Sequence, residues 1–171
     1  MHPIFLVGYM GSGKSTVGKM LSDRLNLRLV DLDTFIETRF HKTISQLFAE
    51  KGEAEFRRIE HAALEEVCVF ENTIVATGGG SACFFDNMEL MNRAGLTVYL
   101  RTSADILAER LNHGKAKRPL VSQKSAEELK AFITDMLKIR EPFYLQAQLT
   151  VDSYALLDFS FVDEIVAKVT E

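Results

Sequence analysis

Short apolar and β-branched runs alternate along the chain with stretches in which apolar residues recur every three or four positions. The runs predict buried strands at Ile4–Val7, Leu29–Asp31, Thr73–Thr77, Thr97–Leu100 and Leu149–Val151. The periodic stretches predict helices at Lys14–Leu25, Asp33–Phe40, Ile44–Glu50, Glu53–Phe70, Asn87–Ala94, Ala104–Leu111, Ala126–Tyr144 and Phe161–Val169. Strands that alternate with helices are typical of an α/β fold, in which helices cover both faces of a parallel sheet.

The composition fits a single folded domain. Of the 171 residues 47% are hydrophobic, which is enough to form a core and argues against a disordered chain. No run approaches the about 20 apolar residues that span a membrane. The first residues lack the basic start and apolar core of a signal peptide. Asn112–Ser125 is polar and basic, and predicts a surface loop.

Charge and cysteine content narrow the partners and the compartment. The formal net charge of −4 argues against nucleic acid as a main partner, because binding to the phosphate backbone needs a basic surface. Cys68 and Cys83 form neither a C-x-x-C pair nor a zinc quartet, which fits a reducing compartment. We therefore expect a cytoplasmic protein without membrane attachment, and a monomer because the sequence has no obvious association seam.

The most specific motif follows the first predicted strand. Gly8-x-x-x-x-Gly13-Lys14-Ser15 has the spacing of a P-loop. Glycines let backbone N–H groups approach a phosphate chain closely, and the next helix directs its positive dipole end at the anion. Lys14 would add charge at the β- and γ-phosphates, and the Ser15 hydroxyl suits Mg²⁺. A plain glycine turn is the alternative, but a strand before and a helix after are the context that a P-loop requires.

Two carboxylates follow the second predicted strand. Asp31 and Asp33 are two positions apart, so they share a face if the strand continues. They lie at the carboxyl end of a parallel strand, the edge at which open α/β sheets bind ligands. A carboxylate there can hold Mg²⁺ through water or accept a hydroxyl proton during phosphoryl transfer. For an isolated D-x-D, a helix N-cap is an equally good explanation of one aspartate.

Two further segments have both a functional and a simpler explanation. In "EFRRIE", Arg57 and Glu60 are three apart on a helix, so Glu60 can orient Arg57 to bind a carboxylate. A solvated helix face is the commoner explanation of such a segment. The glycines of "TGGG", which ends at Gly80, favour close approach of a ligand at the end of the third strand. A plain loop is the alternative there.

Two arginines follow in the second half of the chain. Arg118 precedes Pro119 in the basic loop. Phosphoryl transfer needs charge stabilisation and exclusion of water, which an arginine on a closing lid supplies. Taken alone, Arg118 is explained more simply by a solvated loop. Arg140, in "KIREPFY", can complement a helix dipole or reach the site.

Taken together and in this order, "GYMGSGKST", "DLD", "GEAEFRRIE", "TGGG", "KRPLV" and "REPFY" resemble shikimate kinase over nearly the whole chain. The resemblance implies one domain over residues 1–171 with a P-loop kinase fold: a five-stranded parallel sheet flanked by helices, like that of nucleoside monophosphate kinases. It places a substrate-binding subdomain at about 32–60 and a lid loop at about 112–125. It also implies transfer of the ATP γ-phosphate to the 3-hydroxyl of shikimate, in the pathway to chorismate and aromatic amino acids.

The resemblance implies a role for each matching residue. Asp33, Lys14 and Arg118 would be catalytic, with Asp33 as the base or as the group that orients the hydroxyl. Mg²⁺ would be bound by Ser15 directly and by Asp31 through water. The implied nucleotide-binding residues are Gly11, Ser12, Gly13, Lys14, Ser15, Thr16, Arg110 and Arg118. The implied shikimate-binding residues are Asp33, Arg57, Gly78, Gly79, Gly80 and Arg140, with Glu60 holding Arg57.

The chain departs from the family in one segment, and two alternatives stay open. After the last strand the family often has a basic, proline-containing loop near adenine, where this chain reads "VDSYALLDFSF". A gluconate or nucleotide kinase on the same fold is one alternative, against which "FRRIE", "TGGG" and "REPFY" argue. A nucleotide-binding regulatory module without transferase activity is the other. Such a module should have lost its acceptor-site groups, which this chain retains.

Overall fold

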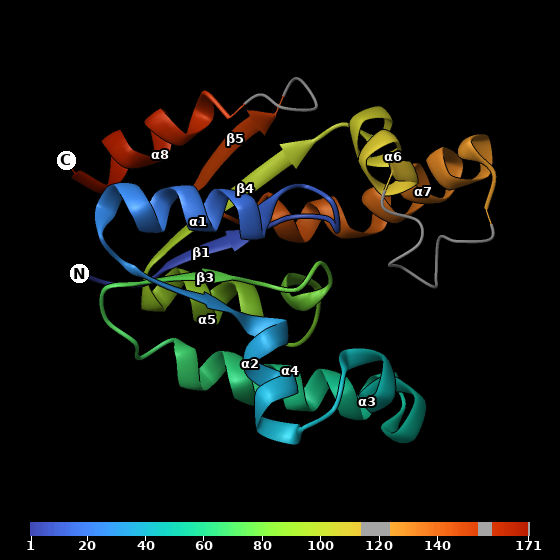
Figure 1. Ribbon diagram of the computed structural model, residues 1–171, viewed down its shortest axis with the longest axis horizontal. Helices are drawn as coiled ribbons and strands as arrows, with labels where there is room; N and C mark the ends of the chain where they lie inside the picture. Colours follow the sequence, from blue (N-terminus) through green and yellow to red (C-terminus); the bar gives the residue numbers. More distant parts are fainter. Residues whose placement is uncertain (114–123, 154–158, 171) are drawn as a thin grey trace.

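A five-stranded parallel sheet organises the molecule. The computed structural model describes residues 1–113, 124–153 and 159–170, and its strand order is β2-β3-β1-β4-β5 (Figure 1). The strands are β1 (Ile4–Val7), β2 (Arg28–Asp31), β3 (Thr73–Ala76), β4 (Leu96–Thr102) and β5 (Leu149–Ser153). Each neighbouring pair is parallel, so the predicted α/β class and five-stranded sheet are confirmed.

Helices connect the strands. They are α1 (Lys14–Leu25), α2 (Leu32–Phe40), α3 (Ile44–Lys51), α4 (Glu53–Val67), the short 3₁₀ helix η1 (Ser81–Cys83), α5 (Asn87–Ala94), α6 (Ala104–His113), α7 (Ala126–Tyr144) and α8 (Phe161–Thr170). The sequence missed η1. It also extended α4 to Phe70, which was wrong: the chain turns after Val67, and the Phe70 ring packs against Phe35 with centroids 6.2 Å apart. Helix α6 runs to His113, within the segment predicted to be a loop.

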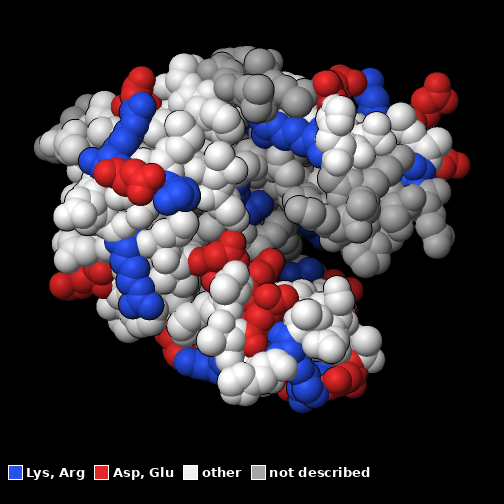
Figure 2. All heavy atoms as spheres, viewed as in Figure 1, with Lys and Arg blue, Asp and Glu red and all other residues white. Residues whose placement is uncertain are grey.

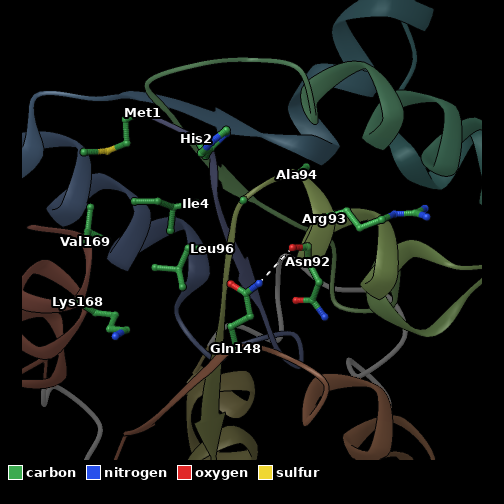
Figure 3. Close-up of a pocket in the computed structure, with 11 residues that line it drawn as sticks. Met1, His2, Ile4, Asn92, Arg93, Ala94, Leu96, Gln148, Lys168 and Val169 are labelled. Atoms are coloured by element: carbon green, nitrogen blue, oxygen red, sulfur yellow. Dashed lines mark hydrogen bonds between the residues drawn. The ribbon is translucent and has the colours of Figure 1, made fainter. Parts of the chain in front are cut away.

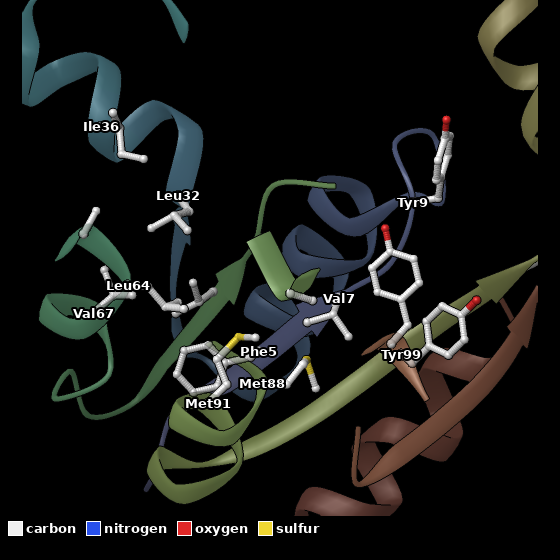
Figure 4. Packing of buried hydrophobic residues seen from close by; sticks show 14 of the residues in the cluster. Phe5, Val7, Tyr9, Leu32, Ile36, Leu64, Val67, Met88, Met91 and Tyr99 are labelled. Carbon is white, nitrogen blue, oxygen red and sulfur yellow. The ribbon is translucent and has the colours of Figure 1, made fainter. Parts of the chain in front are cut away.

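Two hydrophobic cores lie on opposite faces of the sheet. Alternate residues of β1 point to opposite faces. Ile4 and Leu6 pack with α1 and α8, whereas Phe5 and Val7 face the core that includes α4, α5 and α7. In the core that contains Phe5 and Val7, Met88 and Met91 of α5 are buried beside β1 (Figure 4).

Helices α2, α3 and α4 form a lobe beside the sheet (Figure 1). Helix α3 begins at a capping box in which Thr43 and Gln46 bond to each other's backbone N–H groups. Since α2 begins where β2 ends, the lobe starts at the carboxyl edge of the sheet. Figure 2 shows the surface hollowed between this lobe and the body of the sheet, with acidic and basic atoms at the rim.

Some predictions fall on residues that the structure does not describe. Arg118 and Pro119 of the expected lid lie outside the described residues, as does most of the departing segment after β5. Among the helices of the described ranges, none has the length and apolar character needed to cross a membrane.

Candidate active site

The P-loop motif forms the predicted turn between β1 and α1. Gly8, Gly11 and Gly13 all have positive φ, at 147°, 84° and 95°. Gly13 is the N-cap of α1, and no side chain caps this helix end. Backbone N–H groups of the first turn are therefore directed at the place where a phosphate would bind. The turn and the first turn of α1 contain the residues predicted to bind nucleotide: Gly11, Ser12, Gly13, Lys14, Ser15 and Thr16.

Lys14 is largely buried beneath the turn. Its Nζ donates to the carbonyl oxygens of Gly8, at 2.7 Å, and Tyr9, at 3.0 Å. The positive charge is thus held against the loop that would wrap the phosphates. Ser12 is also buried, and no described group lies within hydrogen-bonding range of its Oγ.

Asp31 joins the end of β2 to the P-loop. Its Oδ2 accepts a hydrogen bond from the Ser15 hydroxyl at 3.0 Å, and its Oδ1 accepts one from the Thr34 N–H at 3.1 Å. The second bond makes Asp31 the N-cap of α2. The strand ends at Asp31 and does not continue to Asp33, so the condition under which the two aspartates would share a strand face is not met. Both explanations of Asp31 hold at once: it is a cap, and it meets Ser15.

The Ser15–Asp31 pair fits a magnesium ion by its chemistry. A hydroxyl and a carboxylate oxygen are hard ligands of the kind that Mg²⁺ prefers, and Mg²⁺ commonly takes its other ligands from phosphates and water. Within the described part of the chain, no group of three or more His, Cys, Asp or Glu side chains could hold a metal ion. An ion here would therefore depend on the nucleotide for much of its coordination.

Asp33 lies in the first turn of α2 and is half-buried. Burial raises its pKa to about 6, and the neighbouring carboxylates of Asp31 and Glu60 add to the rise, while Lys14 opposes it. Such a carboxylate is ionised at neutral pH, yet binds a proton far more readily than an ordinary aspartate. It can therefore accept a proton from a hydroxyl held beside it.

Arg57 of α4 is a buried cation, and the sequence predicted that it binds a carboxylate. Its Nη1 donates to Glu60 Oε2 at 2.8 Å, and the Glu60 side chain is 1% exposed. The guanidinium lies 4.2 Å from the centre of the Phe84 ring and 5.4 Å from that of Phe56. No described acceptor bonds to its buried Nε. The predicted Arg57–Glu60 pair is present, and the solvated-face explanation holds instead for Arg58, whose side chain is 71% exposed.

The triple-glycine turn lies against these groups. A Cβ added to Gly80 would lie 2.6 Å from Arg57 Nη2, and one added to Gly78 would lie 3.2 Å from Asp33 Oδ1 and 3.0 Å from Glu60 Oε1. One added to Gly79 would lie 3.0 Å from the P-loop N–H nitrogen of Met10. The turn therefore packs tightly between the carboxylates of Asp33 and Glu60 and the P-loop.

Arg140 approaches the same region from α7. Its guanidinium lies 5.5 Å from the centre of the Tyr9 ring, and its charge and that of Arg57 both act on the Cys83 thiol. Burial raises the pKa of Cys83, and these two cations oppose the rise. Tyr144, one helical turn beyond Arg140, donates its hydroxyl hydrogen to the Gly79 carbonyl. Arg57 and Arg140 thus both lie close enough to Cys83 for their charges to act on its thiol.

Arg110 lies across the P-loop from α6. It donates to the Gly11 carbonyl at 3.2 Å and to the Ser153 hydroxyl at 3.0 Å, and burial lowers its pKa. A Cβ on Gly13 would lie 3.9 Å from both Arg110 Nη1 and Phe159 Cε1. The Arg110 guanidinium and the Phe159 ring therefore flank the P-loop at Gly13.

Four residues beside these groups were not identified from the sequence as part of the site: Tyr9, Ser81, Phe84 and Tyr144. Each contacts a predicted site residue, and three of them are aromatic. The only available signal was their position: Tyr9 and Tyr144 lie within the motifs "GYMGSGKST" and "REPFY", and Ser81 and Phe84 follow "TGGG". That position gives no indication of which way a side chain points.

A cavity of about 480 Å³ lies away from these groups, at the amino edge of the sheet (Figure 3). Its lining includes Ile4 and Leu96 at the starts of β1 and β4, and Gln148, which donates to the Asn92 carbonyl at 3.1 Å. Arg93 beside it is paired with Glu89. The P-loop turn and Asp31 lie at the opposite, carboxyl edge of the sheet, so this cavity is separate from the candidate site.

Comparisons with known proteins agree on one family. The sequence model described as shikimate kinase matches residues 10–170. A shikimate kinase of Parabacteroides distasonis is 52% identical over 165 residues, covering 96% of this chain and 95% of the relative. The crystal structure of shikimate kinase from Bacteroides thetaiotaomicron has a TM-score of 0.91 at 47% identity, covering 99% of this chain and 96% of that one. That of shikimate kinase from Acinetobacter baumannii in complex with shikimate has a TM-score of 0.88 at 33% identity, covering 99% and 93%.

Proposed function

The chain belongs to the shikimate kinase family, and we propose that it transfers the γ-phosphate of ATP to the 3-hydroxyl of shikimate with the residues gathered at the carboxyl edge of its sheet. The observation that carries this assignment is the junction at Gly78–Gly80. There the buried Arg57 cation, the Asp33 carboxylate and the P-loop backbone all approach one turn. A carboxylate clamp, a proton acceptor and a phosphate site are what this reaction needs.

On the acceptor side, Arg57 and Arg140 bind the carboxylate of shikimate. A guanidinium offers two parallel N–H donors to a carboxylate, and aromatic rings around Arg57 keep water from the pair. Asp33 holds the reacting hydroxyl and accepts its proton as the oxygen forms a bond to the γ-phosphorus. The bond from that phosphorus to the bridging oxygen breaks, and ADP leaves.

On the donor side, the turn at Gly8–Gly13 and Lys14 hold the phosphate chain, and Arg110 borders the adenine. Mg²⁺ would be held by Ser15, and by Asp31 through water, and would neutralise phosphate charge when bound. Most of the rate would come from positioning and charge stabilisation, since the protein forms no covalent intermediate. Arg118 is proposed as the lid arginine by family resemblance alone.

We also propose a substrate-binding subdomain at about 32–60, which includes α2, α3 and the first half of α4, and a lid at about 112–125. Both cysteines are free, which supports a reducing cytoplasm as the compartment. We propose a monomer, which light scattering after size exclusion tests.

The test is release of ADP from Mg²⁺-ATP, measured in parallel with shikimate, gluconate and AMP as acceptors. Turnover with shikimate alone is expected. AMP has no carboxylate for Arg57, and gluconate carries its carboxylate and hydroxyls on a flexible open chain, whereas the ring of shikimate holds them in a fixed relative position. Equal or greater turnover with gluconate or AMP would assign the chain to a different kinase class. ATP binding without turnover on any of the three would favour the regulatory module.

A further inference from the structure

A chain of buried hydrogen bonds continues behind the Arg57–Glu60 pair. The two carboxylate oxygens of Glu60 accept from different donors: Oε2 from Arg57 Nη1 at 2.8 Å, and Oε1 from Ser81 Oγ at 2.5 Å. Glu60 is 1% exposed and Ser81 0% exposed. Since one donor holds each oxygen, the plane of the Glu60 carboxylate is fixed from both sides.

Ser81 is held in turn by Asn87, the first residue of α5. Asn87 Nδ2 donates to the Ser81 carbonyl at 2.7 Å, and Asn87 is fully buried. Its Oδ1 lies 2.6 Å from Nδ1 of His61. Because the amide NH₂ faces a carbonyl, Oδ1 must be the acceptor, so His61 Nδ1 carries the hydrogen. The chain of hydrogen bonds thus runs from His61 of α4 through Asn87 of α5 and Ser81 of η1 to Glu60, which holds the guanidinium of Arg57.

We propose that Ser81 and Asn87 are positioning residues for shikimate binding: they fix Glu60, and Glu60 fixes the guanidinium of Arg57. This inference rests on the proposed role of Arg57 as the carboxylate clamp. The guanidinium lies in a narrow space. The centre of the Phe84 ring is 4.2 Å from it, and a Cβ added to Gly80 would lie 2.6 Å from its Nη2. Its orientation therefore has to be set accurately by its partner Glu60. A Glu60 carboxylate that loses the Ser81 donor can rotate, and Arg57 then loses its fixed partner.

A second buried network provides a matched control. Thr97 is fully buried in β4; its Oγ1 donates to Asn92 Oδ1 at 2.5 Å and accepts from the Gln148 N–H at 2.9 Å. Asn92 and Gln148 line the cavity at the amino edge of the sheet, away from the site. Thr97→Val therefore removes a buried, bonded hydroxyl, as Ser81→Ala does, without touching the acceptor clamp.

The experiment measures KM for shikimate, KM for ATP and kcat for Ser81→Ala, Asn87→Ala, Thr97→Val and Arg57→Ala. Ser81→Ala is expected to raise KM for shikimate about tenfold, as loss of a hydrogen bond to a charged group should, while KM for ATP stays within about twofold. Asn87→Ala, one bond further away, should raise it about threefold. Thr97→Val should change neither KM. A fifth variant, Ser81→Thr, keeps the hydroxyl, so its KM for shikimate should lie close to that of the wild type.

Two results would overturn the inference. One is that Ser81→Ala and Asn87→Ala leave KM for shikimate unchanged. The other is that they raise both KM values together, as a general distortion of the active site would. If Ser81→Ala does not fold, the Asn87→Ala result decides. Arg57→Ala separates this inference from the assignment beneath it: if that variant keeps its KM for shikimate, the clamp itself is wrong.

Discussion

The two glycine-rich turns of the site require glycine for different reasons. In the P-loop, Gly13 has φ of 95°, but an added Cβ would meet nothing closer than 3.9 Å. In the second turn, Gly80 has φ of −98°, open to any residue, but its Cβ would lie 2.6 Å from Arg57 Nη2. Glycine is thus required at Gly13 by the backbone conformation of the P-loop, and at Gly80 by a side chain that packs against the backbone of the turn.

This difference explains what the sequence could predict. The P-loop requirement is local, since strand, glycines, lysine and helix are consecutive, so the spacing alone predicted the phosphate site. The requirement at Gly78–Gly80 comes from Asp33, Glu60 and Arg57, which belong to α2 and α4. Only the family resemblance indicated that these segments meet, and it gave no sign of Ser81 or Phe84.

Secondary structure followed the same rule. Helices α1, α5 and α7 have the predicted bounds, since their apolar patterns are local. The end of α4 was wrong because Phe70 packs on Phe35, a contact between distant segments. The bounds of β1 were predicted correctly, whereas those of β2, β3, β4 and β5 erred by one or two residues, where pairing with neighbouring strands decides the end.

The largest effect is expected at Asp33, where the acceptor turn meets the reacting hydroxyl. Asp33→Asn should lower kcat about 10³-fold, because the proton acceptor is lost while the shape is kept. The dissociation constant for ATP, measured by calorimetry, should stay within about twofold, because the donor side is built from the P-loop. Unchanged kcat would remove Asp33 from the mechanism.

Alanine at the two turns tests the comparison directly. Gly80→Ala should raise KM for shikimate about tenfold, because the methyl group displaces Arg57, and the overpacking of this buried site should cost about 1–3 kcal/mol of stability. Gly13→Ala should mainly raise KM for ATP and cost about 1–2 kcal/mol of stability, because its φ is positive. If both variants affect the same substrate, the division between the two turns is incorrect.

The pH dependence follows from Asp33. Its pKa in the folded protein is about 6, above the ordinary 3.8, so kcat/KM should fall about tenfold for each pH unit below 6. For stability the sign is the opposite: the raised pKa favours the neutral form, so its contribution is full below 3.8 and is lost as pH rises through 6. Asp33→Asn should therefore be more stable than the wild type at pH 8, by up to about 3 kcal/mol, and the gap should shrink at pH 5. An equal gap in chemical denaturation at both pH values would show that Asp33 is not the cause.

The smallest effect is expected at Asp31, which serves both the backbone and the donor site. Asp31→Asn keeps an oxygen that can cap Thr34, so stability should change by less than about 0.5 kcal/mol. The loss of charge beside Ser15 should raise the Mg²⁺ concentration needed for half-maximal activity several-fold. A loss of stability without any change in the Mg²⁺ requirement would leave Asp31 as a cap alone.

The central claim is that Arg57 recognises the carboxylate of shikimate, and a cycle of two enzymes and two acceptors tests it. The measurement is kcat/KM of the wild type and Arg57→Ala for shikimate and for its methyl ester, which lacks the charge. The wild type should lose about 10²-fold on the ester, as expected for a buried charge pair, whereas Arg57→Ala should lose a clearly smaller factor, because only Arg140 then remains to pair with the carboxylate. If Arg57→Ala loses the same factor on the ester as the wild type does, the carboxylate is bound elsewhere and the account of the acceptor side is wrong.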